Sequence, residues 1–100
     1  MEKARSFVLL DVRPDSLFEA ARIAGSIRAG GLAFEALRDV LPPGFDVPLV
    51  FVSEDGRRPL GAPDRAAEAA GYLRVVWLEG GLRAWAASGL PVVGSRIFPG

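Results

Sequence analysis

Runs of Val, Leu and Phe alternate along the chain with segments whose apolar residues recur at helical spacing. The runs predict strands at residues 7–12, 49–52 and 75–78, and a shorter strand around Ile27. The three longer runs are almost continuously apolar, which is typical of parallel strands covered on both faces. The alternation therefore predicts an α/β fold with a central, mostly parallel sheet and helices on both of its faces.

Four helices are expected, at residues 15–21, 32–41, 63–70 and 82–87. The second is stopped by Pro42, Pro43 and Gly44, because proline lacks the N–H group that would continue the helix. The third begins at Pro63, a favoured first-turn residue, and ends before Gly71, which tolerates the left-handed cap conformation. The second and third helices thus have sequence signals for at least one of their ends.

The composition is that of one globular domain spanning residues 1–100, since half of the residues are apolar. Twelve basic and twelve acidic residues balance to zero and form no run of five like charges, so nucleic acid is not an expected partner. No apolar stretch approaches the ~20 residues that span a bilayer, so no membrane contact is expected.

Two further features bear on where the protein works. The first apolar run ends at Asp11 and is too short for a signal-peptide core, which predicts a cytoplasmic protein. The chain lacks Asn, Gln and Thr and has eleven arginines against the single Lys3. Loss of labile amides is reported for thermophile proteins, although a biased genome composition gives the same pattern.

The loop at residues 53–58 is the main candidate for a ligand site, because it follows the apolar run 49–52. Ligands of open parallel sheets bind beyond the carboxyl ends of the strands, where the strand order reverses. Gly56 permits the positive φ of a tight loop, whose backbone N–H groups can converge on an oxyanion. Arg57 and Arg58 add positive charge, so a small oxyanion is one predicted ligand.

The same loop also fits a purely structural interpretation. Glu54 and Asp55 oppose an anion and bring the local charge close to neutral. Ser53 is a common capping residue in a polar turn between a strand and a helix. Pro59 and Pro63 delay the next helix and remove N–H donors from this region. The residues alone leave both interpretations open.

A set of motifs in this order resembles the rhodanese-like (sulfurtransferase) family. They are Leu9-Leu10-Asp11-Val12-Arg13, Ile23-Ala24-Gly25, the strand and loop with Ser53, Gly56 and Arg58, and Gly80-Gly81-Leu82-Arg83-Ala84-Trp85. In catalytic members of this family a loop cysteine attacks a sulfane sulfur and holds it as a persulfide. Ser53 occupies the place of that cysteine, so the resemblance implies the fold without the nucleophile.

The missing residue types restrict the chemistry further. The chain has no cysteine, which excludes disulfides, thiolate metal sites and cysteine catalysis. It has no histidine, the commonest general base and transition-metal ligand, so neither a metal nor a cofactor is predicted. A serine hydroxyl is a far weaker acid than a thiol, and Ser53 needs a base to attack an acyl or phosphoryl group.

Three more charged residues are expected at the rim of the site. Asp11 and Arg13 stand at the end of the first strand and favour a structural ion pair, with Arg13 able to reach the pocket mouth. Arg22 stands where the resemblance implies a histidine.

The sequence predicts a catalytically inactive rhodanese-like domain that acts as a binding or regulatory module. Its predicted partner is either a small oxyanion at the loop 53–58 or another protein. The alternative is a sulfurtransferase or phosphatase-like enzyme with a non-cysteine nucleophile at Ser53. A third hypothesis is a structural subunit that joins a partner through an apolar patch near Phe45 or Phe98.

Overall fold

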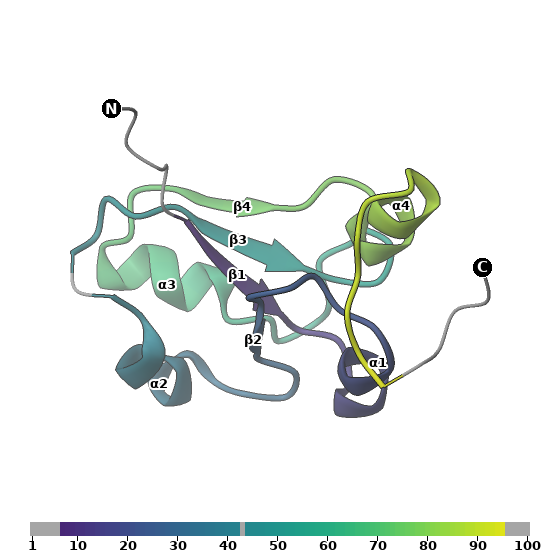
Figure 1. Ribbon diagram of the computed structural model, residues 1–100. Coiled ribbons are helices and arrows are strands. Elements are labelled where there is room, and N and C mark those ends of the chain that lie inside the picture. The colour runs from purple at the N-terminus through teal and green to yellow at the C-terminus, as the bar shows by residue number, and fades with distance from the viewer. Residues whose placement is uncertain (1–6, 43, 96–100) are drawn as a thin grey trace.

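The computed structural model describes residues 7–42 and 44–95, which form one small α/β domain. Its strands are β1 (Val8–Asp11), β2 (Ile27–Arg28), β3 (Leu49–Val52) and β4 (Val75–Trp77). Its helices are α1 (Asp15–Ala20), α2 (Phe34–Leu37), the 3₁₀ helix η1 (Arg38–Val40), α3 (Asp64–Ala70) and α4 (Gly81–Ala87). The four strands make one parallel sheet in the order β2-β1-β3-β4, as Figure 1 shows, and the predicted fold class is confirmed.

The strand order reverses between β1 and β3. The chain leaves β1 on one side to form β2 and returns on the other side to form β3, which pairs with β1 from Val8 and Leu49 to Asp11 and Val52. The loops after β1 and β3 therefore diverge at the carboxyl edge of the sheet. This is the place where an open α/β sheet forms a crevice for a ligand.

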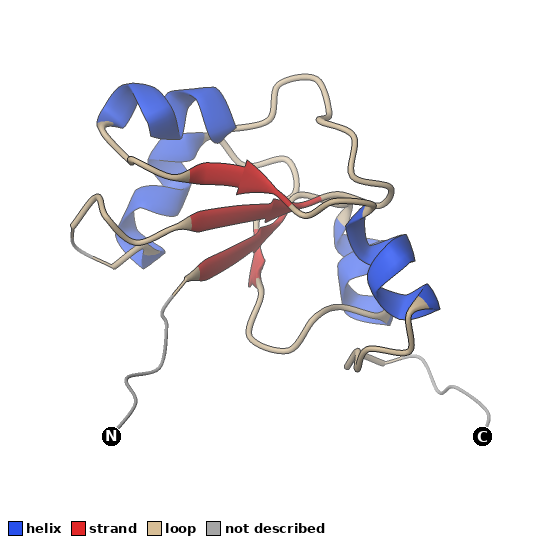
Figure 2. Ribbon diagram, turned by 90° about the horizontal axis from the view of Figure 1, so that it is seen from above, coloured by secondary structure: helices blue, strands red, loops and turns tan. Residues whose placement is uncertain are grey.

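Helices cover the sheet on both faces, with α2 and α3 on one side and α4 on the other (Figure 2). Alternate strand residues point to opposite faces, so Leu10 and Phe51 pack with Ala67 of α3 on the first face. Val52 packs with Leu82 of α4 on the second. The apolar runs are nearly continuous because the side chains on both faces of each strand are covered by helices.

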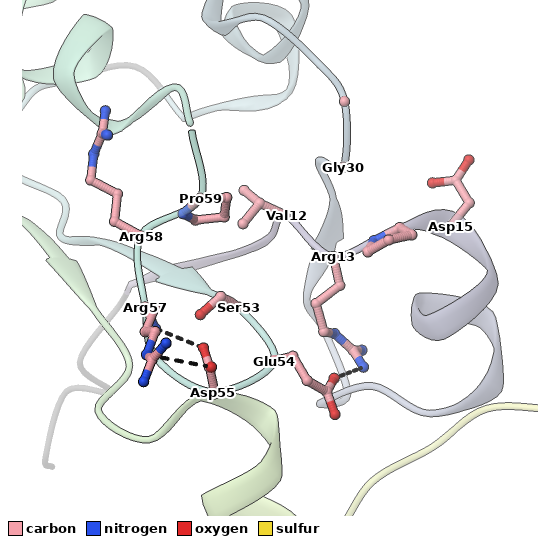
Figure 3. Close-up of a pocket in the computed structure, with 12 residues that line it drawn as sticks. Val12, Arg13, Asp15, Gly30, Ser53, Glu54, Asp55, Arg57, Arg58 and Pro59 are labelled. Atoms are coloured by element: carbon pink, nitrogen blue, oxygen red, sulfur yellow. Dashed lines mark hydrogen bonds and ion pairs between the residues drawn. The ribbon is translucent and has the colours of Figure 1, made fainter. Parts of the chain in front are cut away.

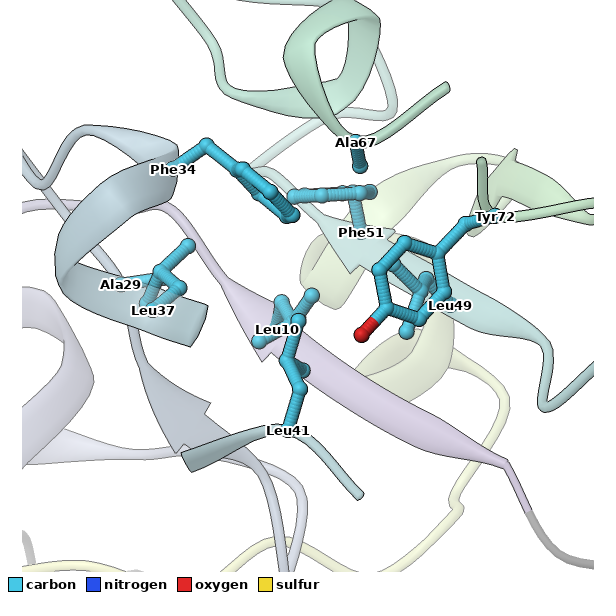
Figure 4. Packing of buried hydrophobic residues seen from close by; sticks show 9 residues of the cluster. All are labelled: Leu10, Ala29, Phe34, Leu37, Leu41, Leu49, Phe51, Ala67 and Tyr72. Carbon is cyan, nitrogen blue, oxygen red and sulfur yellow. The ribbon is translucent and has the colours of Figure 1, made fainter. Parts of the chain in front are cut away.

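The larger cluster of buried side chains surrounds Phe51, which is completely buried (Figure 4). Its ring lies 5.3 Å from the ring of Trp77 in β4. Tyr72 packs in T-shaped geometry with Phe34 and with Phe45, with ring centroids 6.1 and 5.0 Å away. Of the two residues expected near an apolar patch, Phe45 is half-exposed and packs on Tyr72. Phe98 lies outside the described residues.

The helix predicted at residues 32–41 is shorter than expected. The α-helical part begins at Phe34 and passes into η1, and Leu41 is extended, with ψ of 144°. Pro42 explains why Leu41 is extended, because the residue before a proline is driven out of the helical conformation. None of the helices formed by the described residues is long and apolar enough to cross a membrane.

Candidate functional site

An open pocket of about 710 Å³ lies at the carboxyl edge of the sheet, between the ends of β1, β2 and β3 (Figure 3). We call it the edge pocket. Its lining comes from three loops and consists of Val12, Arg13, Pro14 and Asp15, of Gly30 and Gly31, and of Ser53, Glu54, Asp55, Arg57, Arg58 and Pro59. The loop predicted as the ligand site thus forms one side of a pocket at the point where the strand order reverses.

Ser53 is bound within its own loop. Its side chain is buried, with the residue 5% exposed, and its Oγ accepts a 2.9 Å hydrogen bond from the Gly56 N–H. Gly56 has a φ of +90°, and a Cβ there would lie 2.6 Å from the Gly80 nitrogen. The hydroxyl therefore closes a tight turn that is packed directly against the start of α4.

Asp55 takes up the next N–H group of the loop. Its Oδ1 accepts a 3.0 Å hydrogen bond from the Arg57 N–H, and its Oδ2 lies 3.8 Å from the Arg57 Nε. The N–H groups of Gly56 and Arg57 are thus satisfied by oxygens of the loop itself. The Asp55 carboxylate thus takes an N–H group and a guanidinium that an external oxyanion could otherwise use.

Arg58 points away from Ser53 toward the start of α3 (Figure 3). Its Nε donates to both carboxylate oxygens of Asp64 at 2.9 Å, and the Trp77 Nε1 donates to one of them at 3.0 Å. Burial disfavours the charged form of Asp64, but the hydrogen bonds from Arg58 and Trp77 outweigh it and hold the pKa of this carboxyl below its ordinary value. The arginine expected to attract an anion is therefore part of a structural network.

Asp64→Asn is expected to reduce the free energy of unfolding by about 1–3 kcal/mol at pH 7, because it leaves Arg58 without a carboxylate. A carboxyl whose folded pKa is lowered stabilises the fold above its unfolded pKa of about 3.9. That stabilisation is lost as the pH falls through the folded pKa, so the difference between variant and wild type shrinks in acid. Urea unfolding at several pH values measures it. Glu68→Gln on the exposed face of α3 is the control, and an equal loss in both variants contradicts the assignment.

Arg13 is buried beside Asp11 and joins β1 to the loop 53–58. Its Nε and Nη2 donate to the Asp11 carboxylate at 2.9 to 3.1 Å, and Nη2 also donates to the Ala21 carbonyl at 2.6 Å. Its Nη1 lies 3.3 Å from Glu54 Oε1. Arg13 lines the edge pocket, whereas Asp11 is not among the lining residues and contacts the site through Arg13. The pair therefore has the geometry of a structural ion pair.

Arg22 follows the end of α1 and does not line the edge pocket. Its Nη1 donates to the Phe18 carbonyl at 3.2 Å, and its guanidinium lies 4.9 Å from the centre of the Phe18 ring. Its backbone exchanges hydrogen bonds of 2.7 and 2.8 Å with Val93. The structure therefore does not bring Arg22 together with the other predicted site residues.

Sequence reasoning missed the lining that comes from the β2 loop. A Cβ on Gly30 would lie 2.1 Å from the Arg13 carbonyl oxygen, so only glycine lets the two loops approach this closely. Gly30-Gly31 follows directly on the short predicted strand at Ile27. The rule that ligands bind beyond parallel strands could have been applied to this strand as well.

The sequence matches the family model of the rhodanese-like domain over residues 1–88. The chain belongs to the rhodanese-like domain family. A rhodanese-like domain from Anabaena is 25% identical, with 94% of this chain and 98% of that chain covered and a TM-score of 0.69. A rhodanese-related protein from Thermoplasma volcanium is 26% identical, with coverage of 90% and 86% and a TM-score of 0.61.

A protein of Rhodopseudomonas palustris, described as a possible tyrosine phosphatase, is 25% identical over 87% of this chain and 70% of its own, with a TM-score of 0.65. Among curated proteins, none matches the chain.

The loop of this rhodanese-like domain is attached to α4 through its carbonyl groups. The N–H groups of Leu82 and Arg83 donate to the carbonyls of Ser53 and Glu54, both at 2.9 Å. The N–H groups at the start of α4 are therefore directed at the loop backbone. The helix that follows the loop, α3, begins only at Asp64, after the turn around Pro59.

The charges around the edge pocket are paired with one another. Arg13 contacts Asp11 and Glu54, Arg57 contacts Asp55, and Arg58 contacts Asp64. Within residues 7–42 and 44–95, no three acidic side chains come together in a way that could hold a metal ion. The pocket thus combines a neutral charge balance with apolar lining residues, namely Val12, Pro14 and Pro59.

Proposed function

We propose that this rhodanese-like domain does not transfer sulfur and serves as a binding module, with the edge pocket as its contact site. The observation that carries the proposal is Ser53, which stands in the position of the family's cysteine with its Oγ bound by the Gly56 N–H. A thiol has a pKa near 8.5, and a helix end or a nearby arginine lowers it further. A serine hydroxyl gives no comparable anion and forms no equivalent adduct with sulfur.

Protein contact is favoured over oxyanion binding by the occupied donors of the loop. A sulfate or phosphate would have to displace Asp55 from the Arg57 N–H and from the Arg57 guanidinium. It would also meet a pocket whose arginines already have carboxylate partners. An apolar or mixed protein surface needs no such displacement, because it can cover the apolar lining residues and leave the ion pairs in place.

The rival function is an enzyme that uses Ser53 on a phosphoryl or sulfane group. The Rhodopseudomonas palustris relative, with its description as a possible tyrosine phosphatase, gives this rival its support. Against it stands the need for a base, because a serine nucleophile is weak until a neighbouring group accepts its proton. Glu54, the next residue, is directed to Arg13.

The test measures thiosulfate-to-cyanide sulfur transfer and aryl phosphate hydrolysis with the wild-type protein and Ser53→Ala. We expect no turnover by the wild type above the rate of Ser53→Ala in either assay. Turnover by the wild type that disappears in Ser53→Ala would assign the activity to this residue and overturn the proposal. Equal turnover by both proteins would point to a contaminant or to another site, and a second preparation by a different purification separates these two.

A further inference from the structure

A projecting leucine lies directly beside the edge pocket. Leu60 is 99% exposed, at the tip of a turn in which the Ala62 N–H donates to the Pro59 carbonyl at 3.3 Å. Gly61 follows with a φ of +75°, which is typical of the third residue of a type II turn. Pro59 and Pro63 restrict the backbone on both sides. The turn therefore holds Leu60 in solvent in a defined position.

The pocket and the leucine share one wall. Pro59 lines the edge pocket and also lines a smaller adjoining pocket of about 270 Å³, to which Leu60 and Leu32 contribute. Apolar surface thus continues from Val12 across Pro59 to Leu60. A single exposed leucine needs no explanation. Leu60, however, continues the wall of a pocket that is large enough to hold another leucine side chain. We call Leu60 the knob and the edge pocket the hole.

We propose that the partner bound by the edge pocket is a second copy of this chain, with Leu60 of each copy inserted into the edge pocket of the other. A surface that carries both a knob and an adjacent hole is complementary to itself when two copies meet about a two-fold axis. Two such contacts form in each dimer, and no separate partner surface is required. The inference rests on the proposed function, because it names the occupant of the same contact site.

The charges of this face favour a copy of the chain over a strongly charged partner. The edge pocket is lined by three arginines and three acidic residues, namely Arg13, Arg57, Arg58, Asp15, Glu54 and Asp55. The whole chain carries twelve basic and twelve acidic residues. Two identical neutral faces meet without net repulsion, whereas a strongly basic or acidic partner finds no opposing field here. A net charge near zero also promotes self-association.

Sedimentation velocity of the wild type, Leu60→Asp and Leu73→Asp from ~5 to ~500 µM tests the proposal. We expect a concentration-dependent monomer–dimer equilibrium for the wild type. Leu60→Asp should weaken it by about a hundredfold or more, because each dimer loses two buried leucines. Leu73→Asp should dimerise like the wild type. Leu73 is 75% exposed but precedes β4, so it lies at the opposite edge of the parallel sheet.

Three results would overturn the proposal: a wild type that is monomeric up to the highest concentration, a Leu60→Asp variant that dimerises like the wild type, or equal weakening by both variants. Amide NMR spectra at increasing concentration provide a second readout. Shifts at Val12, Gly31 and Leu60 are expected. Shifts confined to β4 and the residues just before it, around Leu73, would contradict the proposed contact. A protein that is monomeric and also lacks turnover would contradict this inference but not the proposed function, whereas turnover that depends on Ser53 would contradict the proposed function.

Discussion

Asp11→Ala is expected to lower the free energy of unfolding by about 3–5 kcal/mol, which makes it one of the two most damaging substitutions we anticipate. The carboxylate is 1% exposed and accepts four hydrogen bonds from Arg13, three from the side chain and one from the backbone N–H. Its removal leaves a buried guanidinium with only the Ala21 carbonyl and the half-exposed Glu54 as partners. The cost is mainly that of an uncompensated buried charge.

Chemical denaturation of Asp11→Ala and Asp15→Ala measures this effect against a matched control. Asp15 is also paired with an arginine, but its side chain is exposed and lies 3.8 Å from Arg28. Exposed pairs contribute at most about 1 kcal/mol. If Asp11→Ala unfolds no more easily than Asp15→Ala, Arg13 does not pair with Asp11 as the structure indicates. The description of Arg13 as the link between β1 and the loop 53–58 is then wrong.

Gly81→Ala is expected to be similarly damaging, at about 2–5 kcal/mol, and its damage should fall on the loop 53–58. Gly81 has a φ of +65°, and a left-handed backbone costs an ordinary residue about 1–2 kcal/mol. A Cβ there would also lie 2.4 Å from the Ser53 carbonyl oxygen and 2.5 Å from the Gly56 nitrogen. These are backbone atoms, so the loop itself must move, and overpacking of this kind costs about 1–3 kcal/mol more.

Gly89→Ala separates the two contributions, because Gly89 has a φ of +80° and nothing within 4 Å of an added Cβ. The free energy of unfolding of Gly89→Ala should fall only by the cost of the left-handed backbone. Thermal unfolding gives the difference in stability, and amide NMR shifts at Ser53 and Gly56 report whether the loop has moved. Equal losses in the two variants would show that the loop does not pack on the start of α4 as described.

The strands were predictable because their signal is local. A run such as Leu49-Val50-Phe51-Val52 is short, continuously apolar and rich in β-branched and aromatic residues, which favours a strand between two layers, and β3 coincides with the predicted segment. The helix predicted at residues 32–41 was too long, since helical spacing of apolar residues does not distinguish an α-helix from a 3₁₀ continuation. The proline that shortens it acts through the backbone of the preceding residue.

The candidate site was predictable in place but not in detail. Residue types and the parallel-sheet rule located the loop 53–58, yet they could not decide which carboxylate each arginine would meet. Arg58 pairs with Asp64 because the turn around Pro59 brings the start of α3 back beside it. The charge of Asp55 predicts repulsion of anions, whereas in the structure its carboxylate also accepts a hydrogen bond from an N–H group that an anion could use. Such choices depend on tertiary packing that no local pattern encodes.

Thiosulfate-to-cyanide sulfur transfer, measured side by side with the wild type and Ser53→Cys, decides whether the loop 53–58 can still support sulfur chemistry. We expect no transfer by the wild type, because the nucleophile is absent. We also expect none by Ser53→Cys, because Asp55 accepts a hydrogen bond from the Arg57 N–H group and α3 begins only at Asp64, well after the loop 53–58. Transfer by the wild type would contradict the loss of sulfur chemistry. Transfer by Ser53→Cys alone would contradict the claim that the hydrogen bonds within the loop 53–58 prevent the reaction. It would mean that this rhodanese-like domain lacks only the cysteine.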